Sequence, residues 1–192
     1  VVVSNTVRAQ YKDGSHRIFT LNNASSMVAN LTMANGSTWG SGSHNYGGGF
    51  RINVDGGTVS NCVVVGARTT GSQCFNAGAF VLGGLVTHTV FRDCVNESQD
   101  SVQHHEFRSG VLGVANSARV ENCLFDNNNQ KTAVYLLRAD NNSIVRNCTI
   151  VNSSLSKTNN YCTSFAAIYA EANSTIQNVV VAGVTNTIDG AA

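Results

Sequence analysis

A short pattern of apolar and polar residues recurs along the chain, and each copy is centred on an Asn or its substitute. One copy is RVENCLFDNN (119–128) and another is IVRNCTIVNS (144–153). The residue two places before the centre is β-branched in all seven copies, and the residue three places after it is apolar in six. The central residues, spaced 25 to 34 apart, are Asn5, Asn30, Asn61, His88, Asn122, Asn147 and Asn178. This regularity predicts a structural repeat.

The alternation of inward and outward positions changes phase at the central Asn. Val120 would face the core of an extended strand, yet Cys123 and Phe125 must also face it. A bend with one residue in the left-handed region causes such a shift, and Asn tolerates that region best among non-glycine residues. We therefore predict a corner at each Asn, with the corner amides bonded into a ladder that satisfies buried polar groups.

A second apolar segment precedes each corner after the first. These segments are RIFTL (17–21), FRINV (50–54), AFVLG (79–83), GVLGV (110–114), AVYLL (133–137) and AAIYA (166–170). One turn then holds three strands, two bends and a variable loop. Stacked turns of this kind predict an all-β fold, a parallel β-helix (solenoid) of about seven turns that spans residues 1–192 as one domain. Parallel crossovers favour the right-handed form.

The segments AGAF, SGVL and FAAI alternate with NCLFDNN and NCTIVNS, and this alternation resembles right-handed parallel β-helix proteins. Those proteins include the pectin-lyase-like group and autotransporter passenger domains. FDNN (125–128) is also similar to the FxxN motif that polymorphic outer-membrane proteins combine with GGA[ILV], although most turns match only one of the two motifs. The resemblance implies a groove along one outer sheet, where enzymes of the group act on polysaccharides through clustered Asp residues. An irregular β-sandwich is the alternative, but it predicts neither the fixed corner nor the change of phase.

Charge and composition exclude several classes of function. Charged residues make up 12% of the chain and the net charge is +1, so no basic surface for nucleic acid is expected. No apolar run approaches the roughly 20 residues of a transmembrane helix. The eleven acidic residues are scattered, and no position of the repeat carries two Asp. Because glycoside hydrolysis needs a pair of carboxyl groups, the sequence favours a protein that is not an enzyme.

The longest insertion, residues 92–108, holds the best candidates for catalysis. If the protein is an enzyme, the acid and base come from Asp93, Asp100, His104, His105 and Glu106. Neighbouring His residues on a strand point to opposite faces, so a solvated loop is the favoured interpretation. No Cys/His cluster has zinc-binding spacing, and neither a metal nor another cofactor is expected.

The six cysteines fall into groups. Cys62, Cys123 and Cys148 share one inward position of the repeat and are expected in the core. Cys74 and Cys94 stand in loops that should stack, so we predict a disulfide between them. Cys162 has no evident mate. An even cysteine count in a chain of low charge fits an extracellular or cell-surface protein.

Three strand segments are too apolar for a sheet that faces water: FVL (80–82), VYLL (134–137) and AIYA (167–170). Such a surface marks an interface. We expect a structural or adhesive β-helix that presents loops and an outer sheet to a protein or glycan at the cell surface. One alternative is a fragment of a polysaccharide lyase or glycoside hydrolase. Another is head-to-tail self-association into a fibre, because neither end shows a cap and Arg8 breaks an apolar column. The chain can also be a segment of a longer protein.

Overall fold

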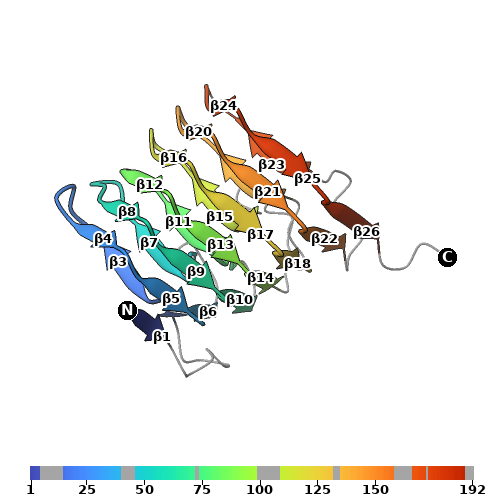
Figure 1. Ribbon diagram of the computed structural model, residues 1–192, viewed down its shortest axis with the longest axis horizontal. Helices are drawn as coiled ribbons and strands as arrows, with labels where there is room; N and C mark the ends of the chain where they lie inside the picture. Colours follow the sequence, from blue (N-terminus) through green and yellow to red (C-terminus); the bar gives the residue numbers. More distant parts are fainter. Residues whose placement is uncertain are drawn as a thin grey trace.

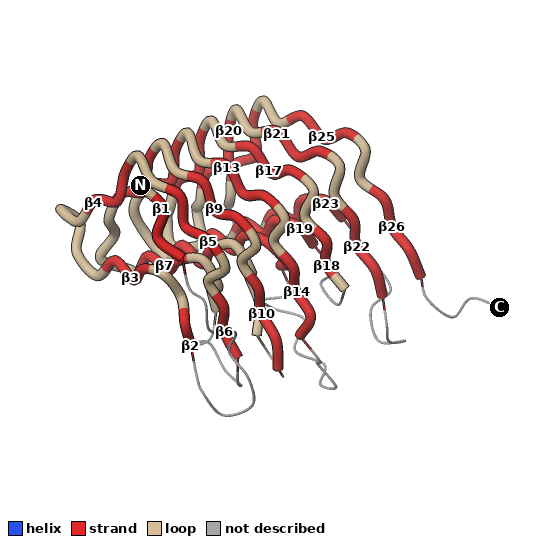
Figure 2. The backbone as a smooth tube through the Cα atoms, turned by 60° about the horizontal axis from the view of Figure 1, so that its bottom comes forward, coloured by secondary structure: helices blue, strands red, loops and turns tan. Residues whose placement is uncertain are grey.

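The computed structural model describes residues 1–4, 15–39, 46–71, 74–98, 109–131, 135–157, 166–171 and 173–188. In these ranges the chain forms 26 strands and no helix, and the strands of successive turns lie side by side in four stacked sheets (Figures 1 and 2). The predicted all-β parallel solenoid is confirmed. None of the described residues belongs to a helix long and apolar enough to span a membrane.

The four sheets follow one another in a fixed order around each turn. Sheet C contains β3 (Phe19–Leu21), β7 (Phe50–Ile52), β11 (Ala79–Val81), β15 (Ser109–Val114), β19 (Tyr135–Ala139) and β23 (Ala166–Ala170). Sheet D contains β4 (Met27–Ala29), β8 (Thr58–Ser60), β12 (Leu85–Thr87), β16 (Arg119–Glu121), β20 (Ile144–Arg146) and β24 (Thr175–Gln177). Sheet A contains β1 (Val2–Ser4), β5 (Thr32–Ala34), β9 (Val63–Val65), β13 (Val90–Arg92), β17 (Leu124–Asp126), β21 (Thr149–Val151) and β25 (Val180–Ala182). Sheet B contains β2 (Ser15–His16), β6 (Ser37–Trp39), β10 (Arg68–Gly71), β14 (Val95–Ser98), β18 (Asn129–Gln130), β22 (Ser154–Lys157) and β26 (Thr185–Ile188).

The number of turns is smaller than predicted. The strands β5 to β24 make five complete turns of four strands each, with partial or irregular turns on either side. The first turn is irregular because β2 runs antiparallel to β6. The prediction of about seven turns counted corners and so included the partial turns. It also missed sheet B, whose short strands are largely polar and carry little apolar signal.

Each described corner residue of the repeat joins sheet D to sheet A with a positive φ. The values lie between 48° and 58° at Asn30, Asn61, His88, Asn122, Asn147 and Asn178. Where a further turn follows, the corner N–H donates to the carbonyl of the residue just before the next corner, as Asn122 does to Arg146 at 3.1 Å. Asn5 lies outside the described residues.

The main chain, and not a row of buried amides, connects these corners. The corner side chains are exposed. Within the described column a single side-chain hydrogen bond joins two corner residues, from Asn178 Nδ2 to Asn147 Oδ1 at 3.2 Å. The expectation that the corner amides satisfy buried polar groups is therefore wrong, and the Asn residues matter for their backbone conformation.

A second corner, which the sequence analysis missed, lies five residues after the first and joins sheet A to sheet B. Its residues have φ between 51° and 65° and are Asn35, Gly66, Asp93, Asn127, Asn152 and Gly183. All of them are Asn, Asp or Gly, the residues that adopt left-handed backbone most readily. The restriction of these positions to Asn, Asp and Gly is the feature of the sequence that could have predicted the second corner.

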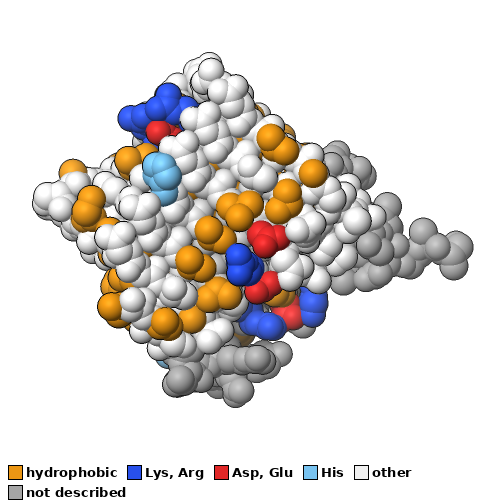
Figure 3. Space-filling view, viewed as in Figure 1, with side chains coloured by type: hydrophobic (Ala, Val, Ile, Leu, Met, Phe, Trp, Pro, Cys, Tyr) orange, Lys and Arg blue, Asp and Glu red, His pale blue; other side chains and the backbone are white. Residues whose placement is uncertain are grey.

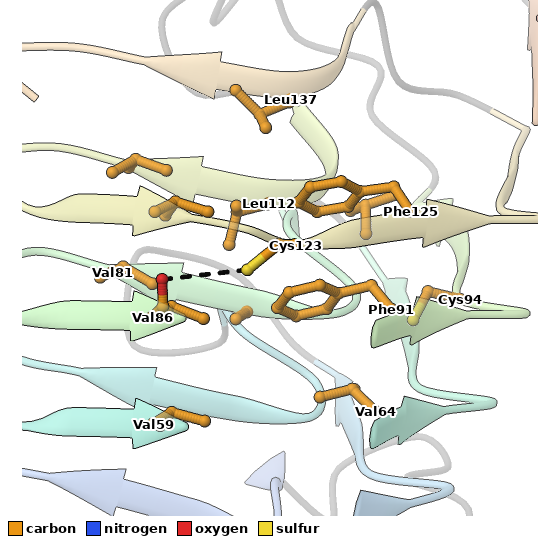
Figure 4. Packing of buried hydrophobic residues seen from close by; sticks show 14 of the residues in the cluster. Val59, Val64, Val81, Val86, Phe91, Cys94, Leu112, Cys123, Phe125 and Leu137 are labelled. Atoms are coloured by element: carbon orange, nitrogen blue, oxygen red, sulfur yellow. Dashed lines mark hydrogen bonds between the residues drawn. The ribbon is translucent and has the colours of Figure 1, made fainter. Parts of the chain in front are cut away.

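The core is apolar between sheets A, C and D and partly polar beside sheet B. The rings of Phe91 and Phe125 stack at 5.0 Å and 4° between successive turns (Figure 4). Beside sheet B, the buried Gln130 accepts a hydrogen bond from Asn96 N at 3.1 Å and donates one to Cys94 O at 2.9 Å. Buried amides thus do bridge successive turns, but inside sheet B and not at the corners.

The cysteines give one correction. Cys62, Cys123 and Cys148 are buried in the inward column, as predicted. Cys74 and Cys94 are also buried, but they are not joined, so the predicted disulfide is wrong. Cys94 follows the second corner directly, and its side chain turns into the core instead of into a loop. Burial raises the pKa of both thiols to about 12, and Cys162 lies outside the described residues.

Candidate ligand-binding site on the outer face of sheet C

The outer face of sheet C carries one row of positions in register, with one residue from each strand. In register the row runs through Thr20, Arg51, Phe80, Gly113, Arg138 and Tyr169. The residues on either side of the four inner members, such as Leu112 and Val114 beside Gly113, are buried in the core, whereas those beside Thr20 and Tyr169 are in part exposed. The alternation of a strand therefore fixes this row on the outside of the solenoid.

Arg138 holds two carboxylates from successive turns. Its Nε lies 2.7 Å from Asp140 Oδ2, and its Nη2 lies 2.7 Å from Glu171 Oε2. The guanidinium carbon also lies 5.4 Å from the ring centroid of Tyr169, which is a cation–π distance. Arg138 and Asp140 are 6% and 7% exposed, whereas Glu171 is exposed. The cluster contains two acids and one base, so it carries a net negative charge when both acids are ionised.

The surroundings of Asp140 destabilise the ionised form of its carboxyl group. Burial raises the pKa of Asp140, Arg138 lowers it and Glu171 raises it again, and the net result is a raised pKa. Asp140 Oδ2 is bonded to Arg138, but Oδ1 is buried without a hydrogen-bond partner. An unsatisfied buried carboxylate oxygen is costly, and it is a feature of sites that bind a ligand.

Aromatic rings lie on both sides of this cluster. Tyr135 and Tyr169 stack at 4.5 Å and 19°, and both are half-buried. Farther along the row, Phe80 is covered by Tyr46 in an edge-on contact at 5.1 Å, and Tyr46 also contacts Phe75 at 5.6 Å. The apolar outer strands seen in the sequence are therefore partly covered by their own chain. The tyrosine pair remains accessible.

Two further arginines extend the row toward β3. Arg51 lies 5.5 Å from the Phe80 ring centroid, and its Nε donates to Asn53 Oδ1 at 2.6 Å. Burial and the nearby Arg51 charge lower the pKa of Arg17 to about 10. This end of the face is positive, in contrast to the negative cluster at Arg138.

The opposite outer surface, formed by sheets A and D, is different. In Figure 3 it presents apolar and uncharged side chains, with the charged groups gathered in a few places. Those groups are paired between successive turns: Arg92 lies 3.5 Å from Asp126, and Arg146 lies 3.1 Å from Glu121. Glu121 also pairs with Arg119, so this cluster has one base in excess, whereas the Arg138 cluster has one acid in excess.

The candidates from the insertion at residues 92–108 are not brought together in the described part of the chain. Asp93 is half-buried at the second corner, where its Oδ1 accepts a hydrogen bond from Asn127 Nδ2 at 2.6 Å. Asp100, His104, His105 and Glu106 lie outside the described residues. Among described residues, no group of three or more His, Cys, Asp or Glu side chains is arranged to hold a metal ion.

The Arg138 cluster was missed because the sequence search asked for two Asp at one position. Asp140 and Glu171 both stand seven residues before a corner Asn, and Arg138 and Tyr169 both stand nine before it. A search that allowed an Asp and a Glu in the same column would have found the pair.

Comparisons with known proteins do not add to this description. No family model, no curated protein and no solved structure matches the chain.

Proposed function

We propose that the protein is a secreted or cell-surface binding module that holds a glycan on the outer face of sheet C. The observation that carries the proposal is the stacked pair Tyr135 and Tyr169 beside the buried cluster of Arg138 and Asp140. The flat C–H face of a sugar ring packs on an aromatic ring, and its hydroxyls bond to carboxylates and guanidinium groups. An extracellular setting is part of the proposal because such glycans lie there.

The test measures binding of soluble tetrasaccharides by titration calorimetry. The panel contains neutral cellotetraose, xylotetraose and mannotetraose, together with acidic tetragalacturonate. Replacing Tyr169 by Ala should weaken binding about tenfold or more, because it removes one face of the platform. Leu124→Ala is the matched control, since Leu124 is half-buried on the outer face of sheet A. Absence of binding to every member of the panel, or equal loss in both variants, contradicts the proposal.

A second candidate function is glycoside hydrolysis, and the observation that favours it is the pair of carboxyl groups at Asp140 and Glu171. Such enzymes use two carboxyl groups, one of them an acid with a raised pKa, and the pKa of Asp140 is raised. Against this role, Arg138 binds both groups and stabilises their ionised forms. Release of reducing ends from the same tetrasaccharides, abolished by Asp140→Asn and by Glu171→Gln, would establish the enzyme. Binding without release favours the binding module.

Head-to-tail association is a further part of the proposal. On β25, the last strand of sheet A, Val181 stands in the inward column of Phe125 and Ile150 and is nevertheless 45% exposed. Exposed edge strands of this kind pair with other chains, and heterologous stacking that does not close builds a filament. Sedimentation over a wide concentration range should show growing species for the native chain and less growth for Val181→Lys. A single monomeric species throughout would refute self-association.

A further inference from the structure

The row on the outer face of sheet C is interrupted at Gly113. Phe80 precedes it and Arg138 follows it in register, and both carry large side chains. Because Gly113 has no side chain, the Asn76 amide packs over it. A small depression beside this contact is lined by Gly113, Asn76, Ser109 and Asp140. The free space is about that of one water molecule.

Polar groups converge on this depression from two different turns. Asn76 is 1% exposed and has a φ of 63°, a conformation that directs it over Gly113. Its Oδ1 accepts a hydrogen bond from Ser109 Oγ, and no hydrogen bond from its Nδ2 to another described residue is found. Asp140 Oδ1 is likewise buried without a partner. The depression therefore offers one donor, Asn76 Nδ2, and one acceptor, the Asp140 carboxylate.

A hydroxyl group complements this arrangement, because it donates one hydrogen bond and accepts another. We propose that the depression beside Gly113 and Asn76 is a subsite for a single hydroxyl of a neutral saccharide, an inference that rests on the proposed function. The net negative charge of Asp140, Glu171 and Arg138 disfavours an acidic sugar at this position. Gly113 lies two turns from Tyr169, roughly 10 Å along the stack, a span that a short oligosaccharide covers.

The experiment compares one substitution in the protein with one in the ligand. A Cβ added at Gly113 would lie 2.7 Å from Oδ1, 2.9 Å from Nδ2 and 3.0 Å from Cγ of Asn76, so Gly113→Ala should displace the Asn76 amide from the depression. The ligand is the neutral tetrasaccharide of the panel that binds most tightly, together with its monodeoxy analogues. Against the native protein, one analogue should bind about tenfold more weakly than the parent sugar. Gly113→Ala should bind the parent sugar about tenfold more weakly than the native protein does. It should bind that analogue as tightly as the native protein binds it.

Two further variants make the outcome decisive. Asn76→Gly keeps the positive φ while removing the donor, and it should reproduce the loss seen with Gly113→Ala. Thr20→Ala, in the same row but away from the depression, should bind like the native protein. If tetrasaccharides bind but Gly113→Ala is unaffected, the subsite is refuted and the proposed function stands. If tetragalacturonate alone binds, the neutral subsite is refuted, and if nothing binds, the proposed function fails together with it.

Discussion

The corner at Asn122 provides a direct test of why Asn recurs in this fold. Its φ is 55°, its side chain is exposed, and that side chain makes no hydrogen bond to another described residue. The main-chain bond from Asn122 N to Arg146 O does not depend on the side chain. Substitutions at this position should therefore act through backbone conformation alone.

The expected magnitudes follow from the left-handed conformation. A residue with an ordinary side chain is disfavoured there by about 1–2 kcal/mol, so Asn122→Ala should lower the free energy of unfolding by about 1 kcal/mol. Asn122→Val should cost more, since β-branched side chains fit this region worst. Asn122→Gly should stay within about 0.5 kcal/mol of the native protein, because glycine adopts this φ without strain.

Asn129 is the matched control on the neighbouring strand β18. It is exposed, but its φ is not positive. On a strand, Gly is about 0.5–1 kcal/mol worse than Ala, so the order of the Ala and Gly variants should be reversed between Asn122 and Asn129. Urea unfolding followed by far-ultraviolet circular dichroism measures these differences. If Asn122→Gly destabilises the protein as much as Asn122→Ala, the amide side chain holds the corner and the conformational argument is refuted.

Other predictions concern the core, the thiols and the response to acid. Phe125→Ala should lower the free energy of unfolding by about 3–5 kcal/mol, because the ring is 1% exposed and stacked on its neighbour; a loss below about 1 kcal/mol in urea unfolding would contradict the packing. Cys74 and Cys94 should resist alkylation in the folded protein and react after unfolding without reductant. A disulfide-linked pair of peptides containing them, found by mass spectrometry, would contradict the free thiols. Burial raises the pKa of Glu121, but hydrogen bonds to Arg146 and Arg119 bring it below the usual value. The stability that Glu121 contributes is therefore complete above its unfolded pKa of about 4.3 and is lost as pH falls through its lower folded pKa. Glu121→Gln should reduce the difference between urea midpoints at about pH 6 and about pH 3, and an unchanged difference would contradict the ion pairs.

The fold could be predicted because its strongest constraint repeats in the sequence. Few residues tolerate a positive φ, so the need for a corner appears as Asn at a fixed place beside β-branched and apolar residues. Sheet B could not be predicted in this way. Its inward positions are filled by residues such as Thr69, Asn96 and Gln130, which are buried yet polar. Hydrophobic periodicity does not detect a column of buried polar residues. The second corner, which turns the chain so that these residues face the core, was interpreted as a loop.

The candidate site was missed because Asp140 and Glu171 share a column but are not both Asp, and because this column is not aligned along the whole chain. Its residues stand at constant distances from the corner only in the later turns, because the bend between sheets C and D varies in length. Asp140 and Glu171 align at seven residues before the corner, whereas the equivalent position near β11 is shifted by one. The bonds through Arg138 also depend on side-chain conformations that no repeat pattern specifies.

The sign of its excess charge separates the site from the other ion clusters among the described residues. Glu121 lies between Arg119 and Arg146, and Glu97 lies between Arg68 and Lys131, so each of those clusters has two bases and one acid. Where Arg92 meets Asp126, one base on one turn faces one acid on the next, and the pair is solvated and nearly neutral. Such pairs contribute little and need no functional explanation. At Arg138 the turns instead bring together two acids and one base, with Asp140 buried and one of its oxygens unsatisfied. A hydrophobic replacement would be less costly in a purely structural role, since buried charges seldom add stability. Under the proposed function, a ligand that donates a hydrogen bond would satisfy this excess acceptor.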